Sequence, residues 1–219
     1  MKLTFFVKCS EKVDFLNLLN MNNDSRPSVK IVFIGDSGVG KSSIIGKYDT
    51  GLMPAEVLPT IGANYLSKMF QIDDAEIELR MWDTAGQETY QSLAPIYFLN
   101  SMIAFVVFDI TQRSTFQNIN SWITQLGEYG NSEVVIAIVA NKIDLETERV
   151  VTKSECEQLA QKYDALFFET SAKTGFGIND MISHSLKNLV QNNNDLRYEL
   201  NASKRNSVQK IHKSGNLCC

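Results

Sequence analysis

The segment Gly35-Asp36-Ser37-Gly38-Val39-Gly40-Lys41-Ser42 is the stretch that decides the fold. It fits the pattern G-x-x-x-x-G-K-S, and it lies between an apolar run, 30–35, and a stretch with helical periodicity, 41–48. Glycines let the main chain approach a phosphate closely, N–H groups at a helix start point toward it, and a lysine adds positive charge. The segment therefore predicts a phosphate-binding loop that joins a strand to a helix.

Short apolar runs alternate with longer helix-period stretches after this loop. The short runs are rich in Val, Ile and Phe, as strands covered on both faces usually are. We expect strands at 30–35, 65–72, 77–83, 102–109, 134–141 and 166–169, and helices at 41–48, 91–98, 115–129, 153–163 and 178–190. This order predicts an α/β fold with a doubly wound, mostly parallel six-stranded sheet.

One pair of strands in this sheet is expected to be antiparallel. The second and third runs are joined by Asp73-Asp74-Ala75, which is too short for a helical crossover. They should therefore form an antiparallel pair at one edge. In sheets of this kind, ligands bind outside the carboxyl ends of the strands, so the functional residues are expected in the loops after those ends.

The composition fits one domain with extensions. The chain has 219 residues, of which 44% are apolar and 21% charged, and its net charge of -4 disfavours a nucleic-acid binder. We expect a flexible N-terminal extension at 1–28, a domain at 29–191 and a flexible C-terminal tail at 192–219. Met21 is an alternative first residue, and the first apolar segment is too short for a signal peptide.

The spacing of the cysteines and the length of the apolar runs indicate the cellular environment that the chain is suited to. The four cysteines, Cys9, Cys156, Cys218 and Cys219, have neither the spacing of a zinc site nor that of a disulfide framework. A reducing, cytosolic environment is the simplest interpretation. No apolar run has the length of a membrane span.

The phosphate-binding loop and the third strand predict a magnesium-nucleotide site. The hydroxyl of Ser42 is placed to bind Mg²⁺, and Asp83 at the end of the third strand can hold the ion through a water. The N–H of Gly86 can meet a γ-phosphate, and Gln87 can orient an attacking water. The loop residues expected to contact the nucleotide are Ser37, Gly38, Val39, Gly40, Lys41, Ser42 and Ser43.

The fifth and sixth strands end in segments suited to reading a base. In Asn141-Lys142-Ile143-Asp144, the Asp144 carboxylate can accept from the N1–H and the exocyclic amino group of guanine, which adenine does not offer together. A polar group left unpaired can reject the wrong ligand by ~10⁴ or more. Lys142 should lie along the base, Asn141 should brace the loops, and Ser171, Ala172 and Lys173 should complete the pocket, with the Ala172 N–H donating to guanine. An adenine-nucleotide kinase or ATPase conflicts with this segment.

These loops, in order and spacing, resemble those of the Ras superfamily of small GTPases over about 29–191. The resemblance implies a P-loop NTPase G domain that binds GTP and GDP with Mg²⁺ and hydrolyses GTP. Within it, Pro59-Thr60-Ile61-Gly62-Ala63-Asn64-Tyr65 is similar to switch I of Rab proteins, and the segment from Gly86 to Tyr97 is similar to switch II of their early-endosomal branch.

The resemblance implies roles for both switches. Thr60 would close over Mg²⁺ and the γ-phosphate in the GTP state. Effectors would bind Ile61, Gly62, Tyr65, Trp82 and Tyr97. An exchange factor and a GTPase-activating protein are also implied, the chain is expected to act as a monomer, and its output would be regulation of vesicular traffic through effector recruitment.

The C-terminal Cys218-Cys219 resembles the double-prenylation ending of Rab proteins. Two lipids anchor stably where one binds reversibly. The resemblance implies a chaperone for the prenylated GDP state and a location divided between the cytosol and the cytoplasmic face of intracellular membranes, with endosomes as the expected organelle. The basic residues Lys204, Arg205, Lys210 and Lys213 would add attraction to anionic lipids.

Several positions depart from the Rab pattern. Met53 stands where relatives place an aromatic ring against guanine, Thr89 replaces an arginine, and Leu99-Asn100-Ser101 replaces Arg-Gly-Ala. These departures leave open a module that holds nucleotide constitutively and rarely cycles. No arginine lies between Tyr48 and Thr60, so intrinsic hydrolysis is expected to be slow, on the order of 10⁻⁴ to 10⁻² s⁻¹.

Overall fold

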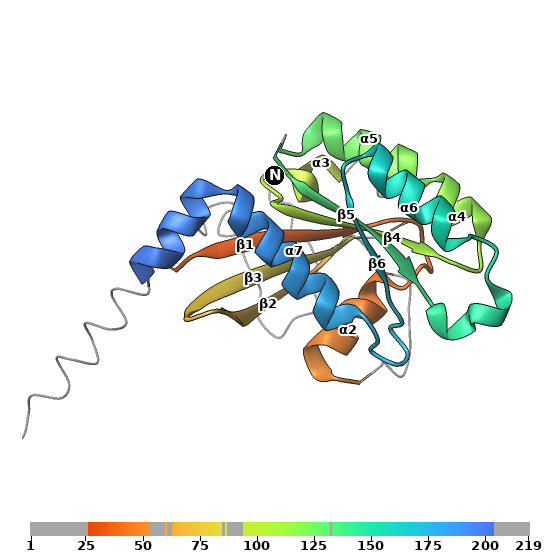
Figure 1. Ribbon diagram of the computed structural model, residues 1–219, viewed down its shortest axis with the longest axis horizontal. Coiled ribbons are helices and arrows are strands. Elements are labelled where there is room, and N and C mark those ends of the chain that lie inside the picture. Colours follow the sequence, from red (N-terminus) through yellow and green to blue (C-terminus); the bar gives the residue numbers. More distant parts are fainter. Residues whose placement is uncertain are drawn as a thin grey trace, which may run out of the picture.

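A central sheet with helices on both faces forms the body of the protein in the computed structural model (Figure 1), which describes residues 26–52, 60, 63–84, 86, 94–131 and 133–203. The strand order is β2-β3-β1-β4-β5-β6. The strands are β1 (Ser28–Ile34), β2 (Ala63–Ile72), β3 (Ala75–Thr84), β4 (Ile103–Asp109), β5 (Val135–Asn141) and β6 (Leu166–Glu169). The helices are α2 (Lys41–Thr50), α3 (Ala94–Phe98), α4 (Arg113–Gln117), α5 (Ile119–Tyr129), the 3-10 helix η3 (Ile143–Glu148), α6 (Lys153–Lys162) and α7 (Ile178–Asn192).

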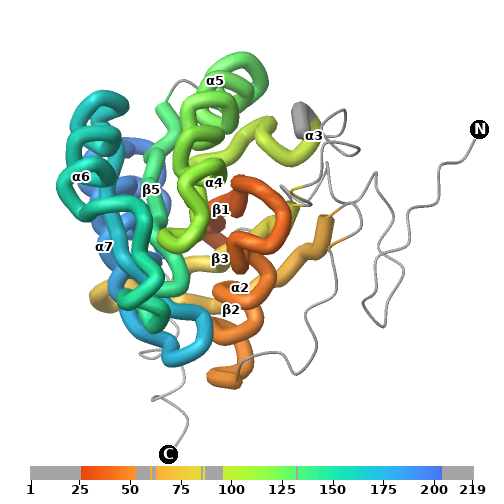
Figure 2. The backbone as a smooth tube through the Cα atoms, turned by 90° about the vertical axis from the view of Figure 1, so that its right-hand side faces the viewer, coloured from red at the N-terminus to blue at the C-terminus, as the bar shows by residue number. Residues whose placement is uncertain are grey.

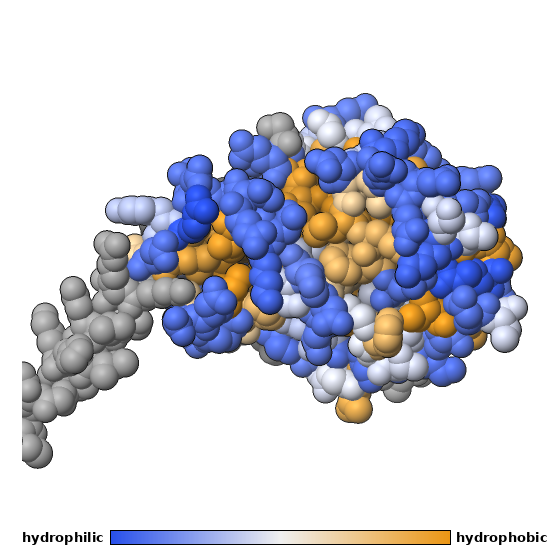
Figure 3. All heavy atoms as spheres, viewed as in Figure 1, coloured by the Kyte–Doolittle hydropathy of each residue, from blue (hydrophilic) through white to orange (hydrophobic). Residues whose placement is uncertain are grey.

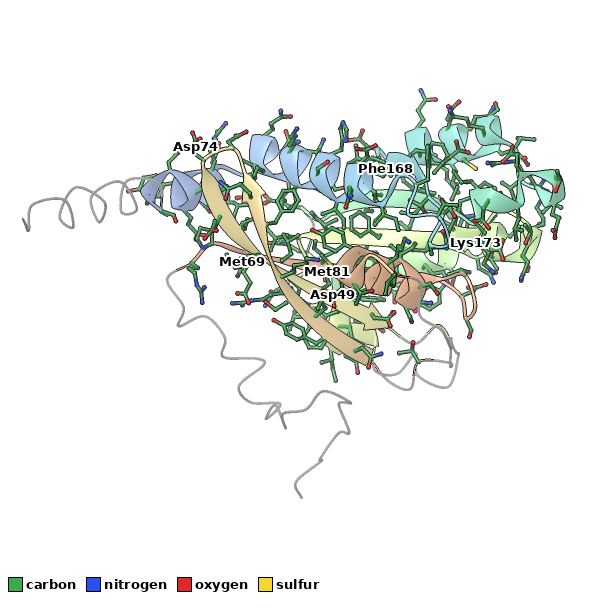
Figure 4. All side chains as sticks on the ribbon, turned by 90° about the horizontal axis from the view of Figure 1, so that it is seen from below. Asp49, Met69, Asp74, Met81, Phe168 and Lys173 are labelled. Atoms are coloured by element: carbon green, nitrogen blue, oxygen red, sulfur yellow. The ribbon has the colours of Figure 1, made fainter. Side chains whose placement is uncertain are left out.

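The predicted α/β sheet is confirmed, including its single antiparallel pair. β1 pairs in parallel with β3 and β4, and the parallel pairing continues through β5 to β6. β2 and β3 pair antiparallel, from Ala63 opposite Thr84 to Ile72 opposite Ala75. Their turn is made possible by Asp73, which adopts a positive φ of 49°. In Figure 4, Asp74 marks this turn at one end of the sheet, and Lys173 lies at the other.

Two apolar clusters hold the helices on the sheet. One packs α2 and α7 against one face, through residues such as Ile44 and Leu186. The other packs α5 and α6 against the opposite face, through residues such as Trp122 and Ala160. All seven residues of β4 are buried, as expected for a central strand that is covered on both sides.

One expected helix is interrupted in the structure. The helix expected at 115–129 is divided into α4 and α5 at Asn118. Its apolar periodicity nevertheless holds, because Ile119, Trp122, Ile123 and Leu126 are buried. Only 94–98 of the helix expected at 91–98 lies within the described residues.

The expected flexible extensions are wrong at their inner ends. The carbonyl oxygen of Pro27 accepts a hydrogen bond from the Glu78 main chain at 3.0 Å, so the sheet begins before residue 29. At the other end, residues 194–203 are helical, and Leu196 and Leu200 are buried in the α2–α7 cluster. Two leucines four residues apart share one helical face, a signal too short to stand out in a polar segment.

The surface between α7 and the α5–α6 layer is hollowed and partly apolar (Figure 3). Leu126 of α5, Leu166 of β6 and Leu189 of α7 are among the residues that line this hollow. Among the residues described, no helix is both long and apolar enough to cross a membrane.

Candidate nucleotide-binding site

A cavity of about 480 Å³ opens at the carboxyl ends of the strands. This is the end of the sheet at which a ligand is expected in a doubly wound fold. Thr84 and Leu145, which the sequence did not single out, also line it. The predicted site residues that line it are Ser37, Gly38, Gly40, Lys41, Ser42, Ser43, Thr60, Gly86, Asn141, Lys142, Asp144, Ala172 and Lys173.

The phosphate-binding loop depends on glycine at its close approaches. Gly40 precedes α2 with a φ of 101°, and a side-chain carbon there would meet the Asn141 amide nitrogen at 2.3 Å. A side-chain carbon on Gly86 would meet the carbonyl oxygen of Asp36 at 2.5 Å. Glycine is therefore required where the loop meets β5 and where the segment after β3 meets the loop.

Lys41 lies inside the loop, with 5% of its surface exposed. Its ammonium donates to the carbonyl oxygens of Gly35 at 2.7 Å and Asp36 at 2.8 Å. Burial lowers the pKa of Lys41 to about 8, while the charges of Asp83 and Asp36 oppose that shift. A bound phosphate would add a further negative charge next to this buried ammonium.

Ser42, Thr60 and Asp83 form a cluster with the chemistry of a magnesium site. Their side chains are linked in sequence: Ser42 Oγ lies 2.8 Å from Thr60 Oγ1, which donates to Asp83 Oδ2 at 3.4 Å. Asp83 is 3% exposed, and its Oδ1 has no hydrogen-bonding partner among the described residues. Hydroxyl and carboxylate oxygens are ligands suited to Mg²⁺, so these residues fit the ion.

The pKa of the Asp83 carboxyl agrees with this interpretation. Burial raises it, and the nearby Ser42 hydroxyl and Lys41 ammonium, together with Asn64 and Thr60, oppose the rise. A buried carboxylate with an open oxygen is costly unless a cation or a donor completes it. A divalent cation here would satisfy that oxygen.

Asn141 joins three loops around the cavity. Its Nδ2 donates to the carbonyl oxygen of Val39 at 2.8 Å, and its Oδ1 accepts from Thr170 Oγ1 and from the Ala172 main chain, each at 3.2 Å. This is the bracing geometry expected of Asn141. The Ala172 N–H, which we expected to donate to a base, is engaged with Asn141 instead.

The Asp144 carboxylate is held at the edge of the same cavity. Ser171 Oγ donates to Asp144 Oδ1 at 2.5 Å, and Lys173 Nζ lies 3.9 Å from Asp144 Oδ2. Ser171 is fully buried, so its hydrogen bond holds one oxygen of the Asp144 carboxylate in place. The other oxygen has the longer ionic contact with Lys173.

Asp109 is a site residue that the sequence reasoning missed. It is buried at the end of β4, and its Oδ2 lies 2.6 Å from Lys142 Nζ. Lys142 has a positive φ of 70° and lines the cavity, so the ion pair fixes the direction of its side chain. The position of Asp109 at a strand's carboxyl end was the available signal.

The three aromatic residues expected to bind effectors lie together in the structure. Trp82 lies between Tyr65 and Tyr97, at ring-centroid distances of 5.2 and 5.7 Å. All three side chains are half-buried. The Lys30 ammonium lies 5.2 Å from the centroid of the Trp82 ring and donates to the Leu99 carbonyl oxygen at 2.6 Å. Gln87, Ile61, Gly62, Cys218 and Cys219 lie outside the described residues.

The comparisons with known proteins agree with this arrangement. The family model for the Ras family matches residues 30–191. Human Ras-related protein Rab-26 is 34% identical over 163 residues, which cover 74% of this chain and 64% of that protein. Rab-2B of Dictyostelium discoideum is 36% identical over 163 residues, covering 74% of this chain and 80% of that protein. Mouse Rab-22A is 38% identical over 153 residues, covering 70% and 79%.

The match therefore spans less than two thirds of Rab-26 but about four fifths of Rab-2B and Rab-22A. The family-model match, residues 30–191, begins within β1 and ends within α7, so it includes residues of all six strands and of the cavity at their carboxyl ends. The phosphate-binding loop, the cluster around Asp83 and the loops around Asp144 all lie within it. The chain belongs to the Ras family and is a Rab-type small GTPase.

Proposed function

We propose that this protein is a magnesium-dependent, GTP-hydrolysing switch that regulates membrane traffic. The observation that carries the proposal is the Ser42–Thr60–Asp83 cluster with its open carboxylate oxygen, of which Ser42 and Thr60 line one cavity with Asp144. These groups suit a phosphate-bound metal at one end and a guanine base at the other. Other Ras-family members share this use of the fold.

The chain's own residues would divide the work as follows. The main chain at Ser37 to Ser43 and the Lys41 ammonium would hold the phosphates, and Asp144 would select guanine. Mg²⁺, held by Ser42, Thr60 and, through water, Asp83, would neutralise charge on the β- and γ-phosphates. Gly86 would donate to the γ-phosphate, and Gln87 would orient the water that attacks it.

The same contacts support a switch. Thr60 belongs to the segment before β2, and its hydroxyl already meets Ser42 of the phosphate-binding loop at 2.8 Å. Loss of the γ-phosphate would remove one partner of Thr60 and of Gly86 together, which would change the surface near Tyr65, Trp82 and Tyr97. Effectors would bind this aromatic surface with Ile61 and Gly62, while an exchange factor and an activating protein would set the nucleotide state.

Membrane attachment would come from prenylation of Cys218 and Cys219, with a chaperone binding the prenylated GDP form. The switch II residues favour endosomal membranes. An intact-mass measurement on protein purified from its own cells tests the attachment. Two added prenyl groups are expected, and an unmodified C-terminus would refute it.

Single-turnover GTP hydrolysis by wild type and Gln87→Leu tests the proposed activity. The wild type should hydrolyse GTP slowly, on the order of 10⁻⁴ to 10⁻² s⁻¹, because the chain has no arginine between Tyr48 and Thr60. The variant should bind GTP equally well and hydrolyse it at least tenfold more slowly. Tight GTP binding without turnover in either protein would favour a constitutively nucleotide-bound module.

A further inference from the structure

A second set of contacts lies behind the phosphate-binding loop. Figure 2 shows α4 and the start of α5 beside the segment that joins β1 to α2. Asp36 of that segment accepts hydrogen bonds from two side chains: Asn118 Nδ2 lies 2.7 Å from its Oδ2, and Trp122 Nε1 lies 2.8 Å from its Oδ1. Both carboxylate oxygens of Asp36 are therefore engaged by residues of the α4–α5 region.

The main chain of Asp36 contacts two residues that line the nucleotide-binding cavity, Lys41 and Gly86. Its carbonyl oxygen accepts from the Lys41 ammonium at 2.8 Å, and a side-chain carbon on Gly86 would meet that same oxygen at 2.5 Å. The Asp36 peptide group, together with the Gly35 carbonyl oxygen, thus fixes the direction of Lys41 and limits the approach of Gly86. A movement of Asp36 would therefore shift both the Lys41 ammonium and the segment that contains Gly86.

The charge of Asp36 has the wrong sign for a phosphate-binding loop. A carboxylate near a triphosphate is repelled by it, and the repulsion grows in a partly dehydrated site. The side chain is instead turned toward α5, and Asp36 is not among the described residues that line the cavity. Charge-assisted hydrogen bonds of this kind are about twice as strong as neutral ones.

The two donors are fixed by the fold. Trp122 is 6% exposed and packed in the α5–α6 cluster, so its N–H needs an internal acceptor. Asn118 stands at the junction between α4 and α5, and its main-chain N–H donates to the Ser114 carbonyl oxygen at 3.0 Å. The break in the expected helix therefore places the Asn118 amide against the loop.

We propose that Asn118 and Trp122 are positioning residues for nucleotide binding. They hold the Asp36 carboxylate away from the phosphates and thereby keep the Asp36 carbonyl oxygen in place for Lys41. The α4–α5 region thus sets how long the loop retains a nucleotide. This inference rests on the proposed function, because it requires that the loop binds a nucleotide's phosphates.

An exchange of the paired side chains provides the sharpest test. Asn118→Asp alone sets two carboxylates against each other and should speed release of a fluorescent GDP, in the presence of Mg²⁺, by tenfold or more. The double variant Asp36→Asn/Asn118→Asp restores one amide–carboxylate pair, and the new amide's oxygen can still accept from Trp122. Release should return to within about threefold of wild type.

Trp122→Phe is an independent variant that keeps an aromatic ring in the core and removes the N–H. It should speed GDP release by roughly tenfold. Thr124→Ala is the matched control on α5, because the Thr124 hydroxyl donates only to the Asn120 carbonyl oxygen of its own helix among the described residues. Its release rate should equal that of wild type.

Release rates and melting temperatures together separate the outcomes. Faster release in Asn118→Asp with recovery in the double variant supports the inference. Lower melting temperatures with unchanged release in Trp122→Phe, or no recovery in the double variant, overturn it. If Asn118→Asp does not fold, Trp122→Phe and the double variant still decide. A wild type that retains no guanine nucleotide refutes the proposed function itself, whereas retention by wild type with wild-type release in every variant refutes only the positioning role.

Discussion

The two ends of the nucleotide-binding cavity differ in how far the protein satisfies its own polar groups. We call the part around Asn141, Asp144 and Ser171, which is proposed to hold the guanine base, the base end. There the Asn141 amide and the Ser171 hydroxyl have partners within the chain. We call the part around Ser42, Thr60 and Asp83, which is proposed to hold Mg²⁺, the metal end. There Asp83 Oδ1 has no hydrogen-bonding partner among the described residues. The base end is therefore built in advance, whereas the metal end is left for a ligand to complete.

Asp144→Asn should have the largest effect, because it changes the group that we propose reads the base. GTP and GDP affinity should fall by ~10⁴, since the introduced amide would present a donor to the guanine amino group. Competition against a fluorescent GDP measures this. Glu146→Gln, an exposed change in the same 3-10 helix, is the control and should bind as wild type does. Equal losses of GTP and ATP binding would show that Asp144 does not select the base.

Asn141→Ala tests whether the base end is prebuilt. The change removes the bond to Val39 and leaves the Thr170 hydroxyl and the Ala172 N–H without their acceptor in a buried region. The free energy of unfolding of nucleotide-free protein should fall by about 2 to 4 kcal/mol. Urea denaturation measures it. A loss below about 0.5 kcal/mol, the level of an ordinary surface substitution, would contradict a prebuilt base end.

Asp83→Asn should raise the stability of the nucleotide-free protein and weaken its Mg²⁺-dependent binding of GTP. Nucleotide-free protein should gain about 1 to 2 kcal/mol of stability, because a buried carboxylate with an unpaired oxygen becomes a neutral amide. The dependence of GTP affinity on Mg²⁺ should weaken at the same time. Thermal melting and a magnesium titration measure the two effects. A variant that is less stable without nucleotide would show that the carboxylate is already satisfied.

Lys30→Met gives the smallest expected effect and tests the surroundings of the Trp82 ring. Burial lowers the pKa of Lys30 from 10.5 to about 8 in the folded chain. Between those values the unfolded chain binds a proton that the folded chain has released, so raising the pH stabilises the fold. From pH 8 to 10 the wild type should gain roughly 2 to 4 °C in melting temperature over the variant. If the melting temperatures of wild type and variant changed equally with pH, Lys30 would have an ordinary pKa in the folded chain.

Most of the fold followed from sequence patterns that act locally. The strand periodicity and the short Asp73-Asp74-Ala75 turn predicted the parallel sheet and its antiparallel pair, which are both present. The 194–203 helix was missed, because its packing depends on Leu196 and Leu200 meeting a cluster formed by distant segments. Local composition there is polar and gives no sign of that contact.

The site was predictable where a motif lies at the end of a strand. Residues of the loop before α2 line one cavity with Asn141, Lys142 and Asp144, and Asp83 contacts Thr60, which also lines it. The pairing of Lys142 with Asp109 and of Asp36 with Trp122 was not predictable in the same way. Each joins residues far apart in sequence, and only the fold shows which polar side chains face each other.

Equilibrium binding of GTP, GDP and ATP, with and without Mg²⁺, tests the central claim most directly. A prebuilt base end predicts that guanine nucleotides bind at least ~10⁴-fold more tightly than ATP whether or not Mg²⁺ is present. An incomplete metal end predicts that Mg²⁺ tightens guanine-nucleotide binding. Equal binding of ATP and GTP, or GTP affinity unchanged by Mg²⁺, would contradict the division of the cavity into these two ends.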